Sequence, residues 1–81
     1  MRVRVHFYSH FKELAGCSEI AEDLGEGSTL GDLLERLIAT RPKLEGVRKS
    51  ALLAVGVEYQ PRSYVLQLGD EVSIFPPVQG G

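Results

Sequence analysis

The sequence has little of what marks secreted, membrane-spanning or disulfide-stabilised proteins. Its 81 residues contain a single cysteine, Cys17, which has no partner for an internal disulfide. No apolar run approaches the roughly 20 residues that a membrane-spanning helix needs. The first residues alternate polar and apolar side chains, unlike the apolar stretch of a signal peptide. We therefore expect a protein of the reducing cytoplasm, with no membrane partner.

The sequence also lacks the residue spacings of common catalytic and metal sites. His6 and His10 have no second ligand at a spacing that suits a metal ion, so we expect solvated or hydrogen-bonded imidazoles. Cys17 lies in an expected loop with no neighbour that marks a reactive thiol. The glycines of residues 25–31 lack the lysine and the spacing of a phosphate-binding loop. These absences argue against a resident metal and against a stand-alone enzyme.

Length and charge narrow the possible functions further. A chain of 81 residues is one domain, and a domain this short buries only about 60–65% of the surface of its unfolded chain, which leaves little room for an enclosed substrate cavity. The formal net charge is −2, and we interpret the basic residues as scattered among acidic ones, without the basic patch of a nucleic-acid-binding protein. We expect a solvated edge from five acidic side chains: Glu13, Glu19, Glu22, Asp23 and Glu26.

The first third of the chain predicts two strands around a helical turn. Residues 2–8 alternate polar and apolar side chains, as in a strand with one buried face. Ser9 is placed to cap a helical turn over residues 10–15, and Gly16 is placed to end it in the left-handed conformation. Residues 18–24 predict a weaker strand.

An amphipathic helix is the clearest element of the sequence. Thr29 and Asp32 resemble an N-terminal capping pair, and Arg41 before Pro42 ends the helix, because a residue that precedes proline disfavours helical geometry. The apolar residues between them recur at helical spacing and form one stripe: Leu30, Leu33, Leu34, Leu37 and Ile38.

The second half of the chain predicts further strands. Residues 43–49 are polar and indicate a loop, and residues 51–57 indicate a buried strand. A turn is expected at residues 59–62, and residues 64–66 form a short strand at best. Residues 71–75 alternate again and predict the last strand.

The order of these elements predicts an α+β roll. One main helix packs on one face of a mixed sheet of four to five strands. The first and last strands are both strongly apolar on one face, so we place them side by side and parallel in the centre of the sheet. In the last strand Val72 and Ile74 face the core, whereas Phe75 points outward with Glu71 and Ser73. The outer face of the sheet is left to solvent or to a partner.

The end of the chain predicts an arm rather than a further element. We divide the chain into a domain, residues 1–75, and an extended tail, residues 76–81. Pro76 and Pro77 favour an extended backbone, and two terminal glycines fit a channel too narrow for side chains. The terminal carboxylate is an anion at neutral pH and a poor electrophile. It must be activated, for instance as an acyl adenylate, so we expect the tail to be a substrate that partner enzymes act on.

The sequence resembles the ubiquitin-like β-grasp sulfur carriers of the MoaD/ThiS family over its whole length. The opening "VRVHFYSHFKELAG" resembles the first strand and the following turn of the family, and the ending "GDEVSIFPPVQGG" resembles its C-terminus. The double proline is more similar to the MoaD type, the small subunit of molybdopterin synthase, than to the thiazole carriers.

The resemblance implies a role in molybdenum cofactor biosynthesis. An E1-like (MoeB-like) enzyme would adenylate Gly81 with ATP, and a sulfur donor would convert it into a thiocarboxylate. Val78, Gln79 and Gly80 would then thread the channel of a MoaE-like large subunit, where the sulfur passes to cyclic pyranopterin monophosphate. The family forms a heterotetramer in which two central large subunits each bind one carrier. The carrier has no resident cofactor and no catalytic residue besides Gly81.

Several side chains near the tail are candidates for a partner interface. We expect Phe75 to contact a partner, together with Pro76 and Pro77. His6 and Tyr8 either extend this interface across adjacent strands or are scattered surface residues. Two alternatives for the function stay open: a carrier of the same kind for thiazole, cysteine or tRNA thiolation, and a ubiquitin-like interaction module whose tail is never activated.

Overall fold

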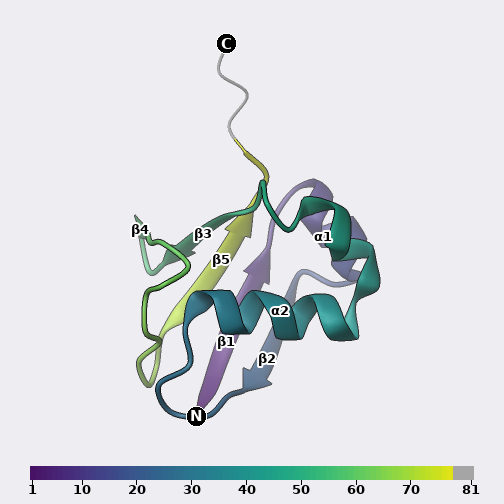
Figure 1. Ribbon diagram of the computed structural model, residues 1–81. Helices are drawn as coiled ribbons and strands as arrows, with labels where there is room; N and C mark the ends of the chain where they lie inside the picture. The colour runs from purple at the N-terminus through teal and green to yellow at the C-terminus, as the bar shows by residue number, and fades with distance from the viewer. Residues whose placement is uncertain (78–81) are drawn as a thin grey trace.

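The computed structural model describes residues 1–77 and contains one five-stranded sheet with a main helix on one face (Figure 1). The strands follow the spatial order β2-β1-β5-β3-β4. The elements are β1 (Arg2–Phe7), α1 (His10–Ala15), β2 (Glu19–Asp23), α2 (Leu30–Thr40), the 3₁₀ helix η1 (Pro42–Val47), β3 (Leu52–Val55), β4 (Glu58–Tyr59) and β5 (Glu71–Phe75). The predicted α+β roll is confirmed.

The two central strands, β1 and β5, pair in parallel, and the three other pairs of neighbouring strands are antiparallel. Val5 lies opposite Val72 and Phe7 lies opposite Ile74, and all four side chains are buried. A parallel pair needs a long crossover connection, and here the crossover contains every other element. The predicted central position of the first and last strands is therefore confirmed.

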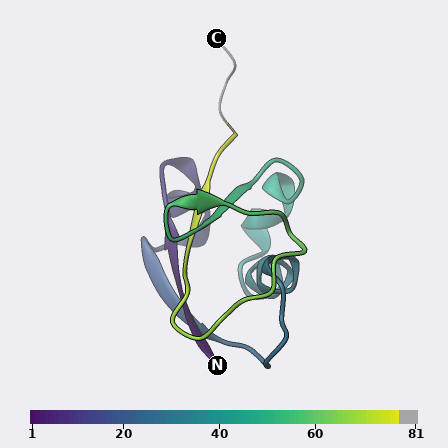
Figure 2. The same cartoon turned by 90° about the vertical axis from the view of Figure 1, so that its left-hand side faces the viewer.

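Helix α2 packs its apolar stripe against the sheet. Thr29 and Asp32 form the predicted capping box: the Asp32 backbone N–H donates to Thr29 Oγ1 at 3.1 Å, and the Thr29 N–H donates to Asp32 Oδ2 at 2.9 Å. All five residues of the predicted stripe are buried. In Figure 2 the sheet lies on the left and α2, viewed nearly along its axis, on the right, so the helix covers one face only.

The turn into α1 differs from the prediction in one respect. Gly16 ends the helix in the left-handed conformation, with φ 80°, as expected. Ser9 makes no side-chain capping bond, and its own φ is 53°. The tight reversal after β1 imposes this backbone conformation, because the Phe11 N–H donates to the Tyr8 carbonyl and the Lys12 N–H donates to the Ser9 carbonyl.

The loop predicted over residues 43–49 was wrong, because the 3₁₀ helix η1 occupies most of it. Pro42 stands at the first turn of η1, where its fixed φ suits a helix and its missing N–H has no intrahelical partner to lose. Leu44 is buried in the core between polar neighbours. One anchoring leucine in a polar stretch gives no periodicity, which is why the sequence pattern indicated a loop.

The middle of the chain also differs from the predicted pattern. The strand expected over residues 51–57 is shorter, because Gly56 turns the chain with φ 61°. The turn expected over residues 59–62 begins inside β4, which pairs with β3 in a short hairpin. The short strand expected near Val65 reduces to one isolated bridge with Thr29.

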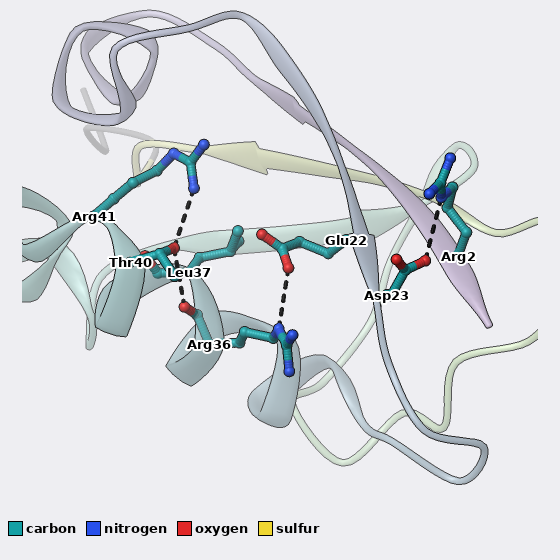
Figure 3. Close-up of polar contacts among 7 residues, drawn as sticks. All are labelled: Arg2, Glu22, Asp23, Arg36, Leu37, Thr40 and Arg41. Carbon is teal, nitrogen blue, oxygen red and sulfur yellow. Dashed lines mark hydrogen bonds and ion pairs between the residues drawn. The ribbon is translucent and has the colours of Figure 1, made fainter.

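Ion pairs tie the edge strand β2 to its neighbours (Figure 3). Arg36 of α2 donates to Glu22 of β2 at 3.1 Å, and the Glu22 side chain is only 15% exposed. Arg2 of β1 pairs with Asp23 at 3.2 Å, and this hydrogen bond and charge hold the pKa of Asp23 below its ordinary value. Glu22 is thus a departure from the expected solvated edge, whereas Asp23 is exposed as expected. No helix among the described residues is long and apolar enough to cross a membrane.

The buried stripe of α2 gives a direct test of the packing. Leu37→Ala removes a fully buried side chain and should lower the free energy of unfolding by about 3 kcal/mol through the lost contacts and the cavity. Urea denaturation followed by far-ultraviolet circular dichroism measures the change. Ala39→Gln, on the exposed face of the same helix, should change stability by less than about 0.5 kcal/mol. Equal losses from both variants would contradict the assigned faces.

The ionisation of Tyr64 should make the stability of the fold depend on pH in the alkaline range. Its phenol donates to Asp70 Oδ2 at 3.0 Å, and desolvation, together with this hydrogen bond and the Asp70 charge, raises the pKa of Tyr64 above its ordinary value of 10.0. The protonated phenol therefore stabilises the fold below pH 10, and this contribution is lost as the pH rises through the folded pKa. Ultraviolet titration of the protein against Tyr64→Phe isolates the group.

The companion variant Asp70→Asn removes the charge and should shift the pKa of Tyr64 part of the way back to its ordinary value, because desolvation remains. A Tyr64 phenol that titrates at its ordinary value in the folded wild-type protein would show that the hydrogen bond does not persist in solution.

Candidate functional site

The face of the sheet opposite α2 carries the candidate site. Side chains alternate between the two faces of a strand, so the register of the strands decides which side chains meet on the outer face. Leu52 lies opposite Phe75, Ala54 lies opposite both Ser73 and Tyr59, and His6 lies opposite Ser73. Aromatic and apolar side chains therefore gather at the end of the outer face where β5 finishes.

Three rings form an aromatic cluster, which we define as Tyr8, Tyr59 and Phe75. Phe75 stacks on Tyr8 with ring centroids 4.8 Å apart and an interplanar angle of 9°. Tyr59 meets Phe75 edge to face, with centroids 6.2 Å apart and an angle of 78°. Both arrangements are favourable for aromatic pairs. Phe75 points outward as predicted, and Tyr8 lies against it.

The aromatic cluster borders an exposed hollow. A volume of about 160 Å³ is lined by Ala54, Gly56, Val57, Tyr59 and Phe75. Val57 is fully exposed at the β3–β4 turn, and Tyr59 is 63% exposed. Apolar side chains that gather on a surface, in contrast to single scattered ones, mark interaction sites. The cluster and the hollow thus form a concave apolar surface beside the end of β5.

His6 belongs to a polar network on the same face and not to the aromatic cluster. Its Nε2 lies 2.9 Å from Glu71 Oε1 and its Nδ1 lies 3.5 Å from Glu19 Oε1. Arg4 donates to the other oxygen of Glu19 at 2.7 Å. The outer face therefore has an aromatic end, near the close of β5, and a charged end, near its beginning.

Two of the six tail residues lie within the described part of the chain. Pro76 is half-buried and Pro77 is exposed, and neither belongs to a strand or helix. Pro76 follows Phe75 directly, so the tail begins at the aromatic cluster. The other predicted tail residues lie outside the described residues: Val78, Gln79, Gly80 and Gly81.

The sequence interpretation missed Tyr59 and Val57, which both contribute to this surface. Tyr59 was assigned to a turn, and Val57 to a buried strand. The available signal was Gly56, a turn-forming residue, followed within three positions by the two apolar side chains. Their proximity to Phe75 depends on the pairing of β3 with both β4 and β5, which no local pattern specifies.

The described residues contain no evident catalytic centre. In residues 1–77 no group of three or more histidine, cysteine or acidic side chains is placed to hold a metal ion. Cys17 is half-buried, and its thiol donates a weak hydrogen bond to the Ala15 carbonyl, 3.9 Å from Sγ. Two larger hollows, of about 360 and 380 Å³, share Leu68 and lie away from the tail. The first borders the loops that contain Gly27 and Gln67, and the second lies on the outer face of the sheet beside Arg4 and Glu71. The outer face thus offers a docking surface.

Several known proteins with similar sequences are molybdopterin synthase sulfur carrier subunits. Residues 5–81 match the ThiS family. The molybdopterin synthase sulfur carrier subunit of Chlamydomonas reinhardtii is 39% identical over 83 residues and is covered completely, as is this chain. The protein of the same name from Arabidopsis thaliana is 33% identical, with 100% of this chain and 84% of the relative covered.

Solved structures show the same fold. SAMP1, a small archaeal modifier protein from Haloferax volcanii, superposes with a TM-score of 0.88 at 25% identity, with both chains covered completely. A chain of the complex of subunits 1 and 2 of molybdopterin-converting factor from Helicobacter pylori superposes with a TM-score of 0.72 at 23% identity, again with both chains covered completely. With its ubiquitin-like β-grasp fold, its match over residues 5–81 and its similarity to molybdopterin synthase sulfur carrier subunits, this chain belongs to the ThiS family.

Proposed function

We propose that this chain is the sulfur-carrier small subunit of a molybdopterin synthase. The observation that carries the proposal is the aromatic cluster where the tail begins, on a sheet face that no helix of residues 1–77 covers. A carrier needs a docking surface and an extended segment that enters the active site of a partner. Here the docking surface and the tail meet at Phe75 and Pro76. The sulfur carrier relatives, similar over the full length, support the same function.

The proposed chemistry takes place on Gly81. An E1-like partner joins the carboxylate to the AMP portion of ATP and releases pyrophosphate, which turns a poor electrophile into an activated acyl group. A donor that supplies sulfur at the oxidation level of sulfide then attacks the carbonyl carbon and displaces AMP, which leaves a thiocarboxylate. In the large subunit this sulfur passes to cyclic pyranopterin monophosphate, and water hydrolyses the acyl group so that the Gly81 carboxylate is regenerated. ATP and the sulfur donor are used by partners, so this chain needs no resident cofactor.

The aromatic cluster is suited to dock the large subunit. Aromatic side chains at the centre of an interface contribute much of its binding free energy, and rigid rings lose little conformational entropy when they are buried. Pro76 and Pro77 restrict the backbone next to the cluster, so docking of the cluster directs Val78, Gln79 and Gly80 toward the partner's channel. In the proposed heterotetramer, each of two central large subunits binds one carrier.

The likeness to SAMP1 supports a second candidate function. The tail would be activated in the same way, but the acyl group would be joined to another protein, as the name of a modifier protein implies. The acceptor separates the two functions: recovery of protein conjugates from cells, without a synthase large subunit, would favour the modifier. The same pull-down would detect a thiazole, cysteine or tRNA-thiolation partner.

Removal of Gly81 should abolish sulfur loading without affecting the domain. Intact-mass spectrometry of the full chain, incubated with ATP, an adenylating partner and a sulfur donor, should show the mass increase of one oxygen replaced by sulfur. The chain that ends at Gly80 should show none and should unfold at the same urea concentration as the full chain. A full chain that is never loaded would contradict the proposal, and unfolding of the shortened chain would show that the tail is structural.

Phe75→Ala should weaken binding of the large subunit. The loss of the central ring should cost about 2 kcal/mol, or about 30-fold in Kd, measured by calorimetry. Leu68→Ala is the matched control, because Leu68 is also apolar and 84% exposed but lines the hollows that lie away from the tail. It should bind like the wild type. Equal affinity of the Phe75 variant and the wild type would remove the aromatic cluster from the interface.

A further inference from the structure

Positive charge is concentrated in one short segment of the chain. Residues 41–49 contain four of the nine basic residues but only one of the eleven acidic residues. This segment therefore has a formal charge of +3 in a chain of net charge −2, which leaves −5 on the rest. The basic residues are Arg41, Lys43, Arg48 and Lys49, and the acidic residue is Glu45. The interpretation of the basic residues as scattered was wrong for this segment.

The fold places this segment at the end of the molecule where the tail begins. η1 packs against α1 and α2, and the chain then enters β3 at Leu52, the register partner of Phe75. Figures 1 and 2 agree that the η1 region lies at the same end of the molecule as the close of β5. Lys49 thus lies three residues before Leu52 in the sequence. β3, which begins at Leu52, and β1, which Tyr8 follows, lie on opposite sides of β5.

Most of these cations have no carboxylate partner within residues 1–77. Elsewhere in residues 1–77, Arg2, Arg4 and Arg36 are each paired with an acidic residue. Lys12 forms no such pair, and Arg62 donates to backbone carbonyls. In the basic segment only Arg48 is paired, with Glu35 and Glu45. Lys43 and Lys49 are exposed and Arg41 donates to the Thr40 hydroxyl at 3.1 Å (Figure 3). We define Arg41, Lys43 and Lys49 as the basic edge.

Hydrogen bonds fix the backbone that carries the basic edge. Arg62 donates through Nη2 to the carbonyl of Arg48 at 2.7 Å and to the carbonyl of Ala51 at 3.1 Å. The Ala51 N–H donates to the Val47 carbonyl at 3.0 Å, and Leu44 anchors η1 in the core. The charges are therefore presented from an ordered support, which favours a defined partner over a diffuse counterion cloud.

We infer that the basic edge is a second docking surface, which binds a carboxylate-rich protein surface beside the channel that receives the tail. This inference rests on the proposed function. An acidic partner surface is repelled by the rest of the carrier, whose charge is −5, and attracted by the basic edge alone. Complementary charge of this kind accelerates association and selects one orientation. The aromatic cluster surrounds Phe75 at the start of the tail, and the basic edge belongs to the segment at the same end of the molecule, so the two surfaces together would orient the tail toward the channel.

A protein surface fits the basic edge better than a nucleotide. Phosphate sites gather several donors around one anion, as backbone N–H groups and guanidinium groups do in a cradle. Lys43 lies near the beginning of η1 and Lys49 follows its end, so their ammonium groups do not converge from one turn. Exposed ammonium groups that lie apart from one another are suited to bind several separate carboxylates on a protein surface.

The double variant Lys43→Gln/Lys49→Gln tests this inference by stopped-flow association with the cognate large subunit. Association should be about tenfold slower at low ionic strength, and the difference should vanish at high salt while the dissociation rate changes little. Lys43→Arg/Lys49→Arg should restore the wild-type rate. Arg2→Gln/Arg36→Gln is the matched control, because it removes the same charge from the far end of β1 and from α2 and should affect association far less.

Three results would overturn the inference. In the first case, the lysine variant would associate like the wild type at every salt concentration. In the second case, the arginine control would slow association equally, which would attribute the effect to net charge. In the third case, the lysine variant would bind the large subunit normally, but the adenylating partner would need a different ATP concentration to activate it. That result would indicate that the basic edge binds a nucleotide. A wild-type chain that does not bind the large subunit at all contradicts the proposed function itself, so the two failures are distinguishable.

Discussion

The parallel pairing of β1 with β5 is the constraint on which the rest of the structure depends. Val5 against Val72 and Phe7 against Ile74 bury apolar side chains from both ends of the chain in the centre of the sheet. The last strand therefore has a neighbour on each side, and the residue that closes it, Phe75, meets rings from both directions. A last strand at the edge of the sheet would have brought the tail out with neighbours on one side only.

The two faces of the sheet divide stability from recognition. The inner face, sealed by α2, carries the core, and the helix is fixed by its capping box and by the pair of Arg36 with Glu22. The outer face carries the aromatic cluster and the polar network around His6. In the proposed function this division is what a carrier requires, because partners supply the catalytic groups and the carrier supplies docking surfaces and an arm.

Local periodicity predicted the parts of the fold that depend on one element at a time. Alternation in the last strand placed Phe75 on the outer face, and helical spacing with Thr29 and Asp32 placed α2 and its cap. It failed where long-range contacts decide. Leu44 is buried by tertiary packing within a polar stretch, and Tyr59 reaches Phe75 only through two strand pairings that no local pattern records. The charge of residues 41–49 was visible in the sequence, but its position beside the tail required the fold.

A single-turnover sulfur transfer assay would decide whether this chain donates sulfur to the pterin. The thiocarboxylated full-length chain is mixed with the cognate large subunit and cyclic pyranopterin monophosphate, and the pterin product is followed by mass spectrometry. We expect sulfur to appear in the pterin while the carrier returns to its unmodified mass. A carrier that binds the large subunit and keeps its sulfur would show that the proposed function is wrong.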